Sequence, residues 1–131
     1  MSSIGVRSGE QKHRIRPLAI TELDGPLSGL TYLSGFGEMT TTTGYIWYIE
    51  GPKEKIIVDT GGKSETLSML GYPARDVQSP ENALGRLGLK CGDIDTVVLT
   101  HLMFDHFEYA GKFGNARFIV QKDELDYARN P

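Results

Sequence analysis

The stretch from Thr96 to Gly111, TVVLTHLMFDHFEYAG, constrains the fold of this chain more than any other. Its residues 97–99 form the continuous apolar run VVL, which is typical of a strand buried on both faces. His101, Asp105 and His106 follow that run directly. A strand end holds such side chains more rigidly than a free loop does, because the strand is fixed by its hydrogen bonds and packing. The sequence therefore predicts a metal-binding or proton-transfer site at this strand end.

Two readings of these three residues stay open. Imidazole nitrogens and a carboxylate oxygen are ligands that zinc and similar divalent ions accept, and in a loop Asp105 and His106 can converge on one ion. Alternatively, both histidines are ordinary polar residues whose hydrogen bonds are satisfied at the end of a strand. The density of potential ligands favours the metal site.

Runs of apolar, β-branched and aromatic residues predict strands elsewhere in the chain, over residues 17–23, 30–33, 40–49, 55–59 and 117–121. Ser79 followed by Pro80 is typical of a helix N-cap and first turn, and predicts a helix with Leu84 on its inner face. We expect a second helix over residues 122–129 and a loop over 71–78. A helix followed by a buried strand indicates an α/β fold.

A second polar strand end comes earlier in the chain. The run KIIVDTGG places Asp59 after an apolar strand and before two glycines that permit a sharp turn. The motif is short, and an aspartate that only caps its own turn is an equally good interpretation. No glycine-rich phosphate-binding pattern follows it.

Composition limits the function classes. The 131 residues suit one domain or a large half of one, and we assign residues 1–16 to a flexible polar arm and 17–131 to the folded part. The net charge of −3 has well-mixed signs, so neither nucleic acid nor an anionic membrane is an expected partner. Cys91, the only cysteine, cannot form an internal disulfide and is expected to be a packed thiol beside a turn. With no signal-peptide-like or membrane-spanning run, we expect a cytoplasmic protein.

The segment HLMFDH resembles the His-x-His-x-Asp-His motif of the metallo-β-lactamase superfamily. The stretches IIVDTGG, LGRLGLKCGDIDTVVLTH and ARFIVQKDELDYA resemble the regions around that motif, so the likeness covers residues 45–129. Among the branches, the chain looks most like the N-acyl homoserine lactonase-type metal-dependent hydrolases. The resemblance implies the N-terminal half of an αββα sandwich: an α/β half with a mixed sheet and helices on one face.

The resemblance also implies residue roles. His101 matches a ligand of the family's first metal, Asp105 and His106 match ligands of the second, and Asp59 matches an aspartate that supports the site from behind. Met103 stands where the family has its second histidine, and a thioether is a poor ligand for zinc, manganese or iron. The implied cofactor is a divalent metal, zinc first with manganese or iron as alternatives, at one site or at reduced occupancy.

The chain resembles only the N-terminal half of the family fold, and the remaining ligands of the family lie in the other half. Three explanations are open: a separate chain completes the site, the sequence is a fragment, or the half associates with a second copy of itself. We expect a complementing chain, because an uncovered half-sandwich exposes an apolar sheet face.

Two functions follow from these expectations. The first is a subunit of a metal-dependent hydrolase that acts on a lactone, ester, amide or thioester carbonyl of a small molecule, with Asp105 also accepting the proton during attack. It is an enzyme only when it is complemented. The second is a non-catalytic, metal-deficient structural subunit, which the change at Met103 favours. We expect Glu108 to lie at the surface in either case.

Overall fold

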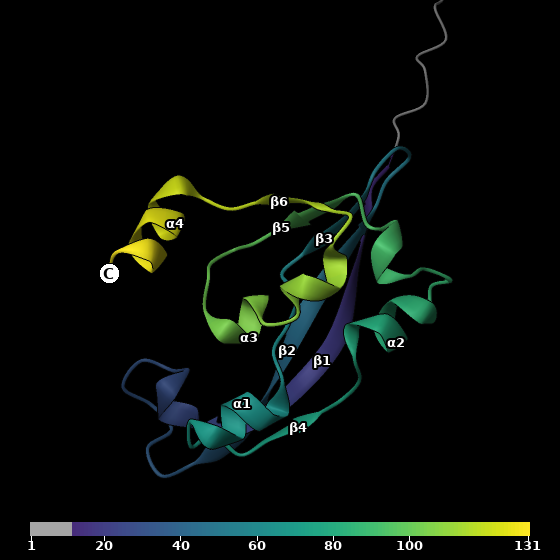
Figure 1. Cartoon of the computed structure of the whole chain (residues 1–131). Coiled ribbons are helices and arrows are strands. Elements are labelled where there is room, and N and C mark those ends of the chain that lie inside the picture. The colour runs from purple at the N-terminus through teal and green to yellow at the C-terminus, as the bar shows by residue number, and fades with distance from the viewer. Residues whose placement is uncertain (1–11) are drawn as a thin grey trace, which may run out of the picture.

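The computed structural model describes residues 12–131, and Figure 1 shows their arrangement. The strands are β1 (Arg14–Pro26), β2 (Met39–Glu50), β3 (Lys55–Val58), β4 (Ala74–Asp76), β5 (Thr96–Val98) and β6 (Arg117–Ile119). The α-helices are α1 (Ser64–Met69), α2 (Pro80–Gly85), α3 (Phe104–Phe107) and α4 (Lys122–Arg129). Short 3-10 turns span Leu27–Gly29, Cys91–Asp93 and Ala110–Phe113.

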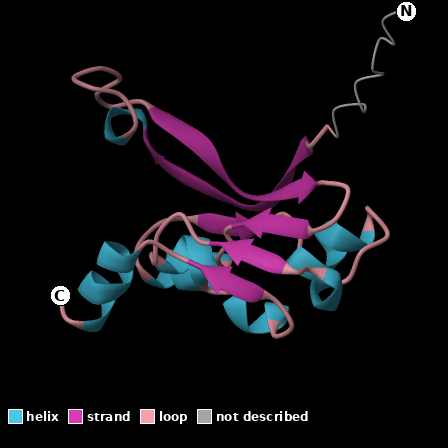
Figure 2. Ribbon diagram, turned by 90° about the horizontal axis from the view of Figure 1, so that it is seen from above, coloured by secondary structure: helices cyan, strands magenta, loops and turns pink. Residues whose placement is uncertain are grey.

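The described strands form one mixed sheet in the order β4-β1-β2-β3-β5-β6. β1, β2 and β3 are joined by antiparallel pairing, and β4 pairs antiparallel with the outer side of β1. β3, β5 and β6 run parallel, so the chain must cross over between them, and the crossover from β3 to β5 carries α1, β4 and α2. Figure 2 shows most of the helices beside the shorter strands, away from the long strands β1 and β2. The predicted mixed α/β sheet with helices on one face is confirmed.

The core lies between the helices and one face of the central strands. Tyr48, Ile57 and Val97 are aligned across β2, β3 and β5, and all three are buried. Leu84 of α2 and Phe113 of the last 3-10 turn pack against this row, both with no exposed surface. Burial of such side chains is the main source of stability in the fold, at about 1.5–3 kcal/mol for each large apolar side chain.

The opposite face of the same strands is apolar and open. Trp47, Val58, Val98 and Ile119 are aligned in register across β2, β3, β5 and β6. None of them is buried, and 40% of Trp47 and 44% of Ile119 is exposed. This row, called the open row below, is an apolar sheet surface of the kind that another layer of protein normally covers.

Several predicted elements need correction. The strand predicted over residues 30–33 is wrong, because these residues form turns in which the Thr31 hydroxyl donates to the carbonyl oxygen of Leu27. The loop predicted over 71–78 contains β4, which pairs with β1. β1 begins at Arg14, so the end of the predicted arm at residue 16 falls inside a strand. Residues 1–11 of that arm lie outside the described residues.

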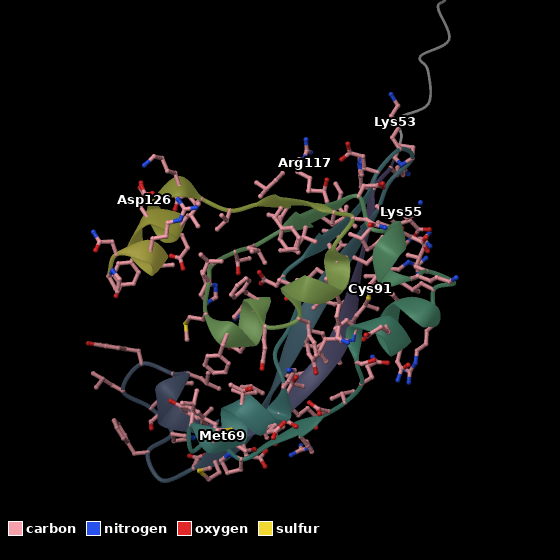
Figure 3. The ribbon with its side chains drawn as sticks, in the orientation of Figure 1. Lys53, Lys55, Met69, Cys91, Arg117 and Asp126 are labelled. Atoms are coloured by element: carbon pink, nitrogen blue, oxygen red, sulfur yellow. The ribbon has the colours of Figure 1, made fainter. Side chains whose placement is uncertain are left out.

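The predicted helices are present. Ser79 caps α2, and its hydroxyl accepts a hydrogen bond from the backbone N–H of Asn82 at 3.2 Å. α4 covers the predicted residues 122–129. Cys91 is a buried free thiol in a 3-10 turn, and burial raises its pKa; Figure 3 places it on the α2 side of the sheet. Within residues 12–131, no helix has the length and apolar character required to cross a membrane.

Candidate functional site

The parallel pairing of β3 with β5 brings the two polar strand ends together. Val58 and Val98 are paired at the carboxyl ends of these strands, so Asp59 and Thr100 emerge side by side at one edge of the sheet. The loop after β5 carries His101 and leads into the one-turn helix α3, which contains Asp105 and His106. Carboxyl ends of parallel strands are the usual location of ligand sites in α/β proteins.

The carboxylate of Asp59 accepts hydrogen bonds from both of these segments. Asp59 is buried, with 5% of its side chain exposed. Its Oδ1 accepts from the backbone N–H of Thr100 at 2.8 Å, and its Oδ2 lies 2.8 Å from both the Thr100 hydroxyl and Nδ1 of His106. Asp59 also has a positive φ of 59°, a conformation that aspartate tolerates better than most residues do. The interpretation of Asp59 as a mere turn cap does not account for these long-range bonds.

The loop of residues 60–62, which follows Asp59 and contains two glycines, is hydrogen-bonded to α3. The backbone N–H of Thr60 donates to the carbonyl oxygen of His106 at 2.7 Å. On the other side, the Thr21 hydroxyl of β1 donates to the carbonyl oxygen of Gly62 at 2.6 Å. The loop is therefore held by β1 and by α3, which fixes the position of His106 relative to the sheet.

His106 and Asp105 face each other across a short gap. Nε2 of His106 lies 3.5 Å from Oδ2 of Asp105, which is longer than a good hydrogen bond. Oδ1 of Asp105 is buried and has no hydrogen-bond partner among residues 12–131. Because the other ring nitrogen of His106 contacts Asp59, an imidazole lone pair and a carboxylate oxygen can both point into this gap. These two residues fit part of a divalent-metal site.

His101 lies beside this pair. Its ring centroid is 4.1 Å from that of His106, with the rings tilted by 47°. Within residues 12–131, however, no three His, Cys, Asp or Glu side chains converge closely enough to hold an ion by themselves. The structure thus brings all the sequence-predicted residues to one edge, and it does not assemble a closed ligand set from them.

Met103 is 56% exposed and precedes α3 as its N-cap residue. It lines an open groove beside Asp105 with the apolar side chains Leu23, Leu67, Leu70, Tyr72 and Phe104. An apolar surface of this kind leads up to the carboxylate of Asp105. Met103 is part of that surface.

Sequence reasoning missed three polar residues around the site. Thr100 bonds to Asp59, and the carboxylate of Glu124 in α4 accepts from the backbone N–H of Leu102 at 2.8 Å. Glu108 accepts from the backbone N–H of Lys63, the residue before α1, at 2.7 Å, and its side chain is only 19% exposed. The surface role expected for Glu108 is therefore wrong. Only Thr100 had a usable signal, since it is a polar residue between a buried strand and His101.

Tyr109 follows α3 and packs against the buried cluster of Ile20, Ile46 and Ala83. Its backbone N–H donates to the carbonyl oxygen of Gly61 at 3.4 Å. Burial raises the pKa of its phenol, and the nearby carboxylates of Asp76 and Glu108 raise it further. The hydroxyl is therefore neutral at ordinary pH.

Comparisons with known proteins point in one direction. Residues 39–126 match the family model of the metallo-beta-lactamase superfamily. The N-acyl homoserine lactonase AiiB of Agrobacterium fabrum is 41% identical over 69 residues, which is 50% of this chain and 25% of that protein.

Solved structures agree with this match at the level of the fold. A mutant of AiiA from B. thuringiensis, solved with N-decanoyl-L-homoserine bound at the active site, superposes with a TM-score of 0.69 at 23% identity, over 92% of this chain and 52% of that one. AidC, a dizinc quorum-quenching lactonase, gives 0.62 at 16% identity, over 96% of this chain and 47% of that one.

This chain spans about half the length of the solved structures that it matches. The residues matched by the family model contain the strand end at Asp59 and the segment from His101 to His106. The family model covers most of the chain, including both of these segments. The chain therefore belongs to the metallo-beta-lactamase superfamily.

Proposed function

We propose that this chain provides half of the active site of a lactonase-like, metal-dependent hydrolase, and that a second half of the fold on another chain completes it. The observation that carries the proposal is the gap between His106 and Asp105. Two electron-pair donors approach there to 3.5 Å, and the second oxygen of Asp105 is buried without a partner in the described part of the chain. A cation in this gap would satisfy both residues.

In this proposal the metal ligands of the chain are Asp105 and His106, with His101 beside them. A bound divalent ion, zinc first, would polarise a substrate carbonyl and lower the pKa of a bound water. Asp59 holds the His106 ring through Nδ1, which leaves Nε2 for the ion. Asp105 accepts the proton of the attacking water, and the leaving oxygen or nitrogen takes a proton as the bond to the carbonyl carbon breaks.

The substrate class follows from the surroundings of Asp105. The groove beside it is lined mainly by apolar side chains, including Leu23, Leu70 and Met103. Such a surface suits a carbonyl compound with an apolar acyl group. The N-decanoyl-L-homoserine bound to the AiiA mutant is a compound of this kind, and a lactone, ester or amide is the corresponding substrate class here.

The open row supports completion by a second half. Trp47, Val58, Val98 and Ile119 are aligned on the face away from the helices, and the solved relatives are about twice as long as this chain. A second sheet packed on this face would bury the row and bring further ligands to the edge where Asp105 lies. A second copy of this chain is the other candidate for this cover.

A non-catalytic role is the alternative function, and the observation that favours it is Met103 in place of a family histidine. In that role the half-fold stabilises a partner and holds little or no metal. Metal analysis of the protein purified with whatever accompanies it in its native cells separates the two functions. The hydrolase proposal predicts about one divalent ion per complex. A complex that stays metal-free after incubation with zinc would support the structural role.

The Asp105→Asn variant makes this test specific. An amide oxygen is a weaker ligand than a carboxylate and cannot accept the proton, so metal content and hydrolysis of an acyl lactone should both fall in the complex, the latter by at least about 100-fold. Asp123→Asn is the matched control, because Asp123 is exposed on α4. Equal losses in the two variants would contradict a role for Asp105.

A further inference from the structure

The hydrogen bonds around Asp59 form a branched chain that reaches both histidines of the site. One branch runs from Oδ2 of Asp59 directly to Nδ1 of His106 at 2.8 Å. The other runs from Asp59 to the Thr100 hydroxyl at 2.8 Å, and from that hydroxyl to Nδ1 of His101 at 3.0 Å. Thr100 is not among the residues to which the resemblance to the superfamily motif assigned a role.

The directions of these bonds follow from counting protons. A carboxylate can only accept, so His106 must donate from Nδ1 to Asp59. A hydroxyl has one proton, and Thr100 places it on Asp59, from which its oxygen is 2.8 and 3.0 Å distant. The contact between Thr100 and His101 is therefore a bond in which the imidazole donates.

We propose that Thr100 is a positioning residue: its hydroxyl oxygen accepts a hydrogen bond from Nδ1 of His101, as Asp59 accepts one from Nδ1 of His106. Thr100 and Asp59 together then hold the two imidazoles in the Nδ1–H tautomer. Each ring then presents Nε2 as a lone pair. Since the ring centroids are 4.1 Å apart, one buried carboxylate prepares two neighbouring nitrogens to act as electron-pair donors.

The consequence for catalysis rests on the proposed function, because the lone pairs matter only if the site holds an ion. The tautomers themselves do not depend on it. They are a property of the 131-residue chain alone and can be measured without metal, substrate or partner. Failure of the tautomer prediction is thus distinguishable from failure of the hydrolase proposal.

Nitrogen-15 NMR of the ring nitrogens, recorded at about pH 8, where a free imidazole is neutral, provides the test. His101 and His106 should both carry the proton on Nδ1. His13, which is exposed, is an internal reference for a ring without a fixed tautomer. A wild-type His101 that carries its proton on Nε2, or on both nitrogens, would overturn the proposal.

Two variants then test whether Thr100 sets the tautomer of His101. Thr100→Val removes the acceptor with little change in shape, and should lower the Nδ1–H to Nε2–H ratio of His101 about two- to tenfold, the value of one ordinary hydrogen bond. His106 should keep its Nδ1–H form, which also reports an intact site. Thr100→Ser should restore the His101 ratio. An unchanged His101 in the valine variant, or no rescue by serine, would show that Thr100 does not set the tautomer; if the valine variant does not fold, the wild-type and serine spectra decide.

Discussion

Gly62 lies where the backbone of α3 passes closest to the loop that follows Asp59. A Cβ added there would be 2.6 Å from Cα of Asp105 and 3.2 Å from the carbonyl oxygen of Phe104. Both contacts are with backbone, which cannot rotate away. The position therefore needs glycine because of a close approach between two segments of the site.

The Gly62→Ala variant should therefore be destabilised, by about 1–3 kcal/mol, as α3 is pushed away from the loop. Urea unfolding followed by circular dichroism measures this. The matched control is Gly85→Ala at the end of α2, where an added Cβ meets no atom within 4 Å. Because alanine favours helix, this control should be neutral or slightly stabilised. Equal destabilisation in both variants would refute the close-approach argument.

A substitution at Met103 tests which metal ligands the second half of the site supplies. If a partner half supplies the remaining ligands of the family's first metal, then Met103→His in the complex should raise the metal content by about one ion, because imidazole is a far better ligand than a thioether. The measurement is metal analysis of wild-type and variant complexes purified in parallel. Unchanged stoichiometry would mean that the partner lacks those ligands as well, which favours the structural role.

At the scale of elements, the pairing of β1 with β2 and β4 is reinforced by one carboxylate. The Thr41 hydroxyl donates to Asp24 at 2.6 Å, and Arg75 contacts the other oxygen at 3.2 Å. The hydrogen bond from Thr41 lowers the pKa of Asp24; desolvation opposes this effect, and the charge of Arg75 adds to it.

A carboxyl group whose pKa is lower in the folded chain than in the unfolded chain makes stability depend on pH in a defined direction. The contribution of Asp24 is present above the pKa that the carboxyl has in the unfolded chain, and it is lost as the pH falls through the lower folded value. An NMR titration of Asp24 should show a pKa below the ordinary range, and Thr41→Val should bring it back up. Thr43→Val is the control, since Thr43 pairs with Glu22 in the register of β1 and β2. A Thr41→Val variant with an unaltered Asp24 titration would disprove the attribution.

At the scale of the whole molecule, the open row makes the isolated chain prone to association. Trp47 is the only tryptophan and is 40% exposed at the β2 end of this row. Sedimentation velocity over a range of concentrations should reveal self-association of the 131-residue chain, and Trp47→Lys should reduce it, because a charge on the row opposes burial. Tyr32→Lys is the control, since Tyr32 is 92% exposed in the loop between β1 and β2. A wild-type chain that stays monomeric at all concentrations would contradict the prediction.

Local sequence determined the elements whose signals are short in range. Ser79 and Pro80 begin α2 because a cap and a fixed φ act within one helical turn. The apolar runs before Asp59 and His101 became strands for the same reason, since a composition of β-branched residues is a local preference. The superfamily and its half-fold followed from motifs of this kind.

Tertiary structure decided the rest. β4 forms because it pairs with β1, which lies more than fifty positions away in sequence. No local pattern in residues 71–78 predicts this pairing. Asp59 became the common acceptor of the site only when β3 and β5 were paired in parallel, which brought Thr100 and His106 to its carboxylate. The sequence thus identified the chemical groups of the candidate site, because each group belongs to a single residue. Which of them touch, and which apolar face stays open, was set by strand pairing between distant segments.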